Sequence, residues 1–116
     1  IVMRRMFSRS FFTTLLLVSF LVSAAGAQTS LPRLKKGESY SSVRGKMIKA
    51  GWKPFHSPDA DKCAAGDKRC EGRPEMESCA GTGLGNCKFL WKRRGKTVAV
   101  FTIGEGSAKY NGHEFQ

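Results

Sequence analysis

Apolar side chains recur at helical spacing in residues 37–51. They are Tyr40, Val43, Met47 and Ala50, and polar residues occupy the opposite face. Glu38 or Ser39 can cap the start of such a helix, and Gly51 suits the position just after its last turn. The pattern therefore predicts one amphipathic helix in this part of the chain.

Residues 88–103 alternate between apolar and polar side chains in the way that is typical of a β-hairpin. Aromatic residues alternate with lysines in the first half, and residues 93–96 supply a turn. The returning strand is apolar on both faces, which predicts a central position in a sheet. Residues 107–110 can pair as a third strand, and we expect Asn111-Gly112 to bend the chain after it.

Residues 57–85 show neither the helical nor the strand period, and the cysteines of the chain lie in or beside this segment. They are Cys63, Cys70, Cys79 and Cys87. Four cysteines permit three pairings. Pairing each cysteine with its nearest neighbour closes two short loops, each stabilising by about 2.5 kcal/mol. We favour this local pairing over the nested one, whose longer loop has a larger closure penalty. Residues 74–78 fit one helical turn or a short strand equally well.

These elements together predict an α+β fold for a single small domain over residues 37–116. One N-terminal amphipathic helix packs on a small antiparallel sheet of three to four strands, with a disulfide-stapled loop between them. Residues 52–56 are extended because Pro54 cannot continue the helix. Residues 28–36 are polar and basic and contain a proline, so we expect a flexible lead-in that packs little.

The first residues of the chain have the pattern of a secretory signal peptide, predicted for residues 1–27. Arginines precede an apolar run over residues 11–22, and Ala25-Gly26-Ala27 suits a cleavage site. The apolar run is shorter than the roughly 20 residues that span a bilayer, so we expect no membrane-spanning segment after cleavage. The protein is therefore expected to be periplasmic or secreted.

The charge balance is strongly basic, with 20 lysine and arginine residues, nine acidic residues and a net charge of +11.

The core of so small a domain buries too little surface to stabilise the fold alone, so covalent cross-links are expected. Four cysteines in an oxidising compartment supply them.

Sites for a metal or another cofactor are not expected. The cysteine spacings are too long for a zinc site, and oxidised cysteines offer no thiolate for catalysis. Residues 81–85 are rich in glycine but lack the preceding strand and following helix of a phosphate-binding loop. Asp59, Asp61 and Asp67 lack the further ligands of a calcium loop.

Two histidines, His56 and His113, raise the hypothesis of a small secreted ribonuclease-like hydrolase. One imidazole would act as base and the other as acid, with a lysine stabilising the phosphate. Nothing in the sequence places both rings at one phosphate. We therefore expect a protein that is not an enzyme.

A basic cluster at the predicted hairpin tip consists of Lys92, Arg93, Arg94 and Lys96. Such a cluster is either a solvated surface or an attraction site for polyanions. Nucleic acid is scarce outside the cytoplasm, so the expected partners are lipopolysaccharide, anionic phospholipid or an acidic protein.

The order of motifs gives one resemblance to known proteins. Gly37-x-Ser39-Tyr40-x-x-Val43, then Met47-Ile48-x-x-Gly51-Trp52, then the run from Cys87 to Trp91, is similar to small exported bacterial α+β proteins. It also resembles a single unit of the module found in β-lactamase inhibitor proteins and outer-membrane assembly lipoproteins. The resemblance implies an envelope protein that binds other proteins, as an inhibitor or an assembly factor. Binding to anionic envelope surfaces is the first alternative, and ribonuclease-like hydrolysis the second.

Overall fold

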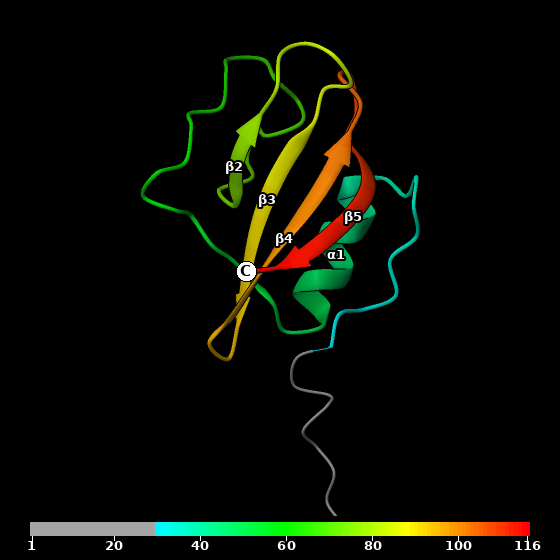
Figure 1. Cartoon of the computed structure of the whole chain (residues 1–116), viewed down its shortest axis with the longest axis vertical. Helices are drawn as coiled ribbons and strands as arrows, with labels where there is room; N and C mark the ends of the chain where they lie inside the picture. The colour runs from blue at the N-terminus through cyan, green and yellow to red at the C-terminus, as the bar shows by residue number, and fades with distance from the viewer. Residues whose placement is uncertain (1–29) are drawn as a thin grey trace, which may run out of the picture.

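In Figure 1 a helix packs beside a twisted antiparallel sheet. The computed structural model describes residues 30–116, so the predicted signal peptide lies outside the described residues. The elements are α1 (Tyr40–Lys49), β1 (Lys53–Pro54), β2 (Met76–Cys79), β3 (Cys87–Arg93), β4 (Lys96–Ile103) and β5 (Lys109–Phe115). The predicted α+β fold is confirmed, with five strands where three to four were expected.

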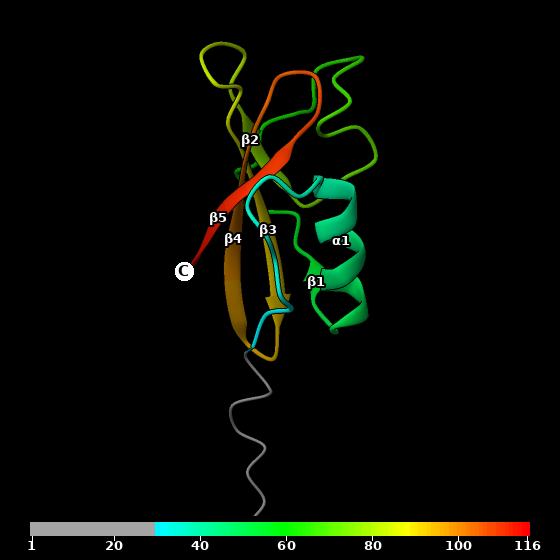
Figure 2. The same ribbon diagram turned by 90° about the vertical axis from the view of Figure 1, so that its right-hand side faces the viewer.

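The strands follow the order β1-β3-β4-β5, and β2 also pairs with β3. The extra strands come from the two short segments β1 and β2, which share one edge of β3. Helix α1 covers one face of the sheet, and Figure 2 shows no helix on the other face among the described residues. Within residues 30–116, the face of the sheet away from α1 therefore has no helix packed on it.

Helix α1 begins and ends where the sequence predicts. Ser39 is the N-cap, and its hydroxyl accepts a hydrogen bond from the backbone N–H of Ser42 at 3.2 Å. Gly51 has a φ of 93°, a conformation that glycine adopts without steric cost after the last turn. Tyr40, Val43 and Met47 are buried against the sheet.

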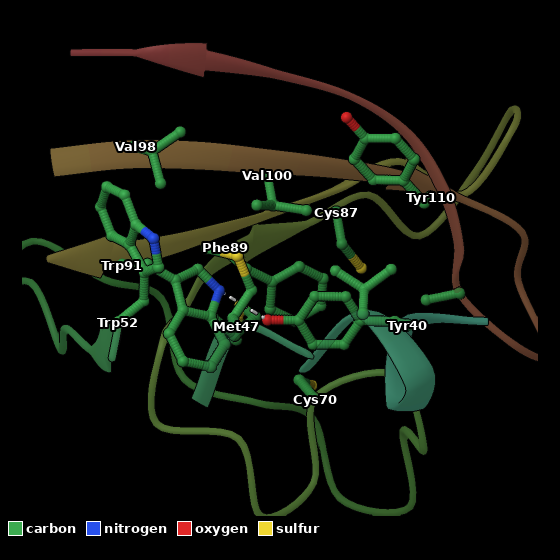
Figure 3. Close-up of a cluster of buried hydrophobic side chains, with 13 residues drawn as sticks. Tyr40, Met47, Trp52, Cys70, Cys87, Phe89, Trp91, Val98, Val100 and Tyr110 are labelled. Carbon is green, nitrogen blue, oxygen red and sulfur yellow. Dashed lines mark hydrogen bonds between the residues drawn. The ribbon is translucent and has the colours of Figure 1, made fainter. Parts of the chain in front are cut away.

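The core lies between α1 and the inward face of β3 and β4 (Figure 3). Tyr40 stacks on Phe89 with ring centroids 3.9 Å apart. The indole N–H of Trp91 donates to the Tyr40 hydroxyl at 3.0 Å. Helix and sheet are thus joined by polar as well as apolar contacts.

Strand β5 continues through Asn111-Gly112, where the sequence predicted a bend. The strand runs on to Phe115, because the pairs Tyr110–Thr102 and Gly112–Phe101 leave Asn111 as an extra residue in a bulge. Gly112 takes a φ of 144°, which suits a glycine in that irregularity. The prediction that the chain turns at these two residues is wrong.

The segment before the helix also departs from expectation. Leu31 and Leu34 are partly buried and pack against the core. The Lys46 ammonium donates to the backbone carbonyl of Arg33 at 3.0 Å. The prediction that this lead-in packs little is therefore wrong at its two leucines.

Candidate binding surfaces

The two disulfides join Cys63 to Cys70 and Cys79 to Cys87, so the local pairing is confirmed. Cys79 and Cys87 are cross-strand partners in β2 and β3. Residues 74–78, left open above, enter a strand at Met76. Two disulfides fit an oxidising, exported setting. Within residues 30–116 no helix has the length and apolar character needed to cross a bilayer.

The two disulfide loops are held together by Arg69, which is only 7% exposed. Its guanidinium pairs with Asp67 at 2.7 Å and donates to the carbonyl oxygens of Ala80 and Gly85 at 2.9 and 3.2 Å. The hydrogen bonds from Arg69 hold the pKa of Asp67 below its usual value. Asp67 is therefore held in an ion pair with Arg69. The two bonds from Arg69 to Ala80 and Gly85 hold the loop of residues 81–85 in place.

Glu75 is fully buried and lies at the centre of a polar network that spans helix, loop and sheet. Its carboxylate accepts from the Tyr40 hydroxyl at 2.9 Å and from Arg44 at 2.6 and 3.1 Å. Desolvation, followed by the charge of Glu75, raises the pKa of Tyr40 well above its ordinary value. The network fixes α1 on the sheet, and the sequence gives no local signal for it.

Glu38 ties the lead-in to the helix. Its carboxylate accepts from Lys46 at 2.7 Å, from the Ser42 hydroxyl at 2.6 Å and from the backbone N–H of Lys35 at 3.0 Å. The hydrogen bond from Lys46, followed by those from Ser42 and Lys35, lowers the pKa of Glu38 from 4.5 to about 2.

Acidification is expected to remove the stability that Glu38 contributes. Because its folded-state pKa lies below its unfolded one, the contribution is present above pH 4.5 and is lost as the pH falls to about 2. We therefore expect the melting temperature of the Glu38→Gln variant to lie below that of the wild type at neutral pH. The gap should close in this acidic window, and a gap that stays constant there contradicts the prediction.

The two histidines lie at opposite edges of the sheet. His56 follows β1, and its Nδ1 is 3.1 Å from the carbonyl oxygen of Pro74. His113 is in β5, with Nδ1 2.6 Å from the Tyr110 hydroxyl. Three strand spacings, about 14 Å in all, separate β1 from β5. The structure does not bring the two imidazoles to a common phosphate.

The predicted basic cluster is found at the turn between β3 and β4, and two further lysines extend it. We call the set the basic end, and its members are Lys49, Lys53, Lys92, Arg93, Arg94 and Lys96. All are exposed except Arg93, which is partly buried. Among residues 30–116, the ion pairs involve none of the five exposed members, Lys49, Lys53, Lys92, Arg94 and Lys96. The sequence alone gave no reason to group Lys53 with the hairpin.

Strand register creates this grouping. Lys53 of β1 lies directly opposite Lys92 of β3, and Arg93 of β3 lies opposite Lys96 of β4. A Cβ atom on Gly51 would lie 3.3 Å from Nε of Arg93, so the end of the helix adjoins the hairpin. Positive charge from four elements, α1, β1, β3 and β4, therefore gathers at one end of the molecule.

The open sheet face lies on the side of the sheet away from α1. Its apolar members are Phe55, Leu90, Ala99, Phe101 and Ile103. They alternate along the strands with residues of the core, and are thus placed on the opposite face. Leu90 and Ala99 are buried beneath their neighbours, whereas the two phenylalanines and Ile103 remain partly exposed.

Lysines surround the open sheet face. The Lys92 ammonium lies 4.0 Å from the ring centroid of Phe55, and Lys88 pairs with Glu77 at 3.2 Å. Lys109 and Glu114 of β5 are exposed beside Ile103 and Ala99. The face thus combines an apolar centre with a mainly basic rim.

Comparisons with protein-family models, with curated proteins and with solved structures each found no match. The resemblance to units of inhibitor proteins and assembly lipoproteins therefore stays a prediction.

Proposed function

We propose that this protein is an exported binding module that docks an acidic protein on its open sheet face. The observation that supports the proposal is the sheet face opposite α1, on which no helix packs among residues 30–116 (Figure 2). This face carries partly exposed aromatic side chains at Phe55 and Phe101. A sheet that is buried on one face is expected to be polar on the other. An apolar centre with a charged rim is instead the composition of a protein interface.

The rim indicates the chemistry of the partner. Lys88, Lys92 and Lys109 border the apolar centre, against the acidic side chains of Glu77 and Glu114. Since Lys88 and Glu77 neutralise each other, the remaining balance is positive. A partner with an acidic rim around an apolar patch would complement this surface.

The test compares two hydrophobic positions. Immobilised protein is used to capture partners from an envelope extract, and the captured protein is then purified and titrated against each variant. Phe101→Ser should weaken the complex about tenfold, because a centrally placed aromatic residue dominates such interfaces. Leu84→Ser is the matched control, since Leu84 is 69% exposed but lies in the loop before β3.

A partner retained equally by both variants would contradict the proposal, as would the lack of any captured protein whose retention depends on Phe101. Circular dichroism of each variant establishes that it is folded, so that loss of binding is assigned to the surface.

A further inference from the structure

The turn between β3 and β4 carries charge at the expense of its own stability. Like charges directly opposite each other destabilise a sheet, and two such pairs, Lys53–Lys92 and Arg93–Lys96, lie at this end. An acidic residue at one position of either pair would have stabilised the strands. Neither pair contains one.

The turn itself also carries a cation in place of a residue that would suit its backbone better. Arg94 and Gly95 form a two-residue hairpin loop with φ angles of 47° and 80°. A loop in which both residues have positive φ strongly favours Asn or Asp followed by Gly. Arg94 is the one non-glycine residue with positive φ among residues 30–116. An arginine here places a cation at the tip where an asparagine would fit the backbone better.

The end of the helix adds to this surface. Lys49 lies in the last turn of α1, where the helix dipole already favours a cation. Its neighbour Ile48 is an exposed aliphatic side chain, 49% accessible. The basic end therefore combines five exposed cations with an apolar side chain close by in the sequence.

The first described residues lie at the same end of the domain as the basic end. The indole N–H of Trp52 donates to the carbonyl oxygen of Ser30 at 3.4 Å, directly after the helix end at Gly51. Figures 1 and 2 both place the start of the described chain at the same end as the β3–β4 turn. The apolar run of the predicted signal peptide, residues 11–22, precedes this point in the sequence. The basic end therefore lies beside the point where the described chain begins.

We propose that the basic end binds the phosphate groups of anionic phospholipids at a membrane surface. Cations held near an anionic leaflet each strengthen attachment about fivefold, and the effect is additive only when they reach the surface together. A flat array of phosphates would explain why like charges are kept side by side at this end. The basic end shares Lys92 with the rim of the open sheet face, but the variants that test it change Lys53, Arg94 and Lys96, so either proposal can fail without the other.

Vesicle sedimentation tests the proposal with the chain of residues 28–116. Vesicles of equal parts phosphatidylglycerol and phosphatidylcholine should bind the protein, and pure phosphatidylcholine vesicles should not. Lys96→Glu and Lys53→Glu each reverse one charge and should weaken binding about thirtyfold. Arg94→Asn removes one charge and should weaken it about fivefold.

The same variants should melt at a higher temperature than the wild type. Lys96→Glu and Lys53→Glu replace like-charge pairs with opposite ones, and Arg94→Asn suits the turn. A variant that binds vesicles more weakly but melts at a higher temperature shows that the replaced charge serves binding and not stability. Lys62→Glu is the control, because it causes the same change in net charge from an exposed position directly before the first disulfide loop.

Three results would overturn the proposal. Equal binding to both vesicle types would show that phosphate charge is not recognised. An equal loss with Lys62→Glu would show that net charge, and not the basic end, drives attachment. Displacement by inorganic phosphate, but not by chloride at the same ionic strength, would identify a site for the free ion instead of a lipid surface.

Discussion

Replacing Glu75 with alanine is expected to lower the free energy of unfolding by about 3 kcal/mol. The change removes a carboxylate with no exposed surface and leaves the Arg44 guanidinium and the Tyr40 hydroxyl without their acceptor. This loss of stability is at the lower end of the range for breaking a buried ion pair, because the Arg44 side chain is 27% exposed and can be hydrated again. Urea denaturation followed by tryptophan fluorescence measures the loss, since Trp91 contacts Tyr40.

Glu71→Ala is the matched control for this prediction. Glu71 also pairs with a cation, Lys68, but its side chain is 55% exposed, so the change should cost less than about 0.5 kcal/mol. Removing both partners, with Arg44→Met and Glu75→Leu together, should cost less than Glu75→Ala alone, because no unpaired charge remains. If Glu75→Ala is as mild as Glu71→Ala, the buried network does not hold the helix on the sheet.

Removing the Cys79–Cys87 disulfide with a pair of alanines is expected to cost about 2.5 kcal/mol from the chain entropy of its loop. A further loss follows because Cys87 is a buried member of the core. The Cys63–Cys70 pair closes a loop of similar length and likewise joins a buried core cysteine, Cys70, to a partly buried one, so its removal should cost about as much. Denaturation of the two double variants measures both losses.

Reduction of the wild type gives the control for the disulfides. With excess dithiol the wild type should approach the stability of a variant that lacks all four cysteines, because the same two constraints are lost. Double variants that unfold at the same urea concentration as the oxidised wild type would contradict the assigned role of the bridges.

Features carried by neighbouring residues could be predicted from the sequence. The helix has its period, its serine cap and its glycine within one short segment, and the hairpin has its alternation and turn. The disulfide pairing followed from loop entropy, which depends only on separation along the chain. These signals are local, and the structure confirms them.

Features that depend on register or on distant contacts could not be predicted. Glu75 meets Arg44 and Tyr40 across 31 and 35 residues, and the acid itself lies in a stretch without periodicity. Lys53 and Lys92 become neighbours only through the pairing of β1 with β3. Asn111-Gly112 has the composition of a turn, but a bulge absorbs the extra residue and the strand continues.

The order of the disulfides has a consequence for biogenesis. Each bridge joins one cysteine to the next cysteine along the chain. A polypeptide threaded N-terminus first through a membrane pore presents Cys63 and Cys70 before Cys79 and Cys87. If the chain is exported as its predicted signal peptide implies, an oxidase that couples thiols as they emerge would make both bonds in order, and we expect oxidative folding to need no disulfide isomerase.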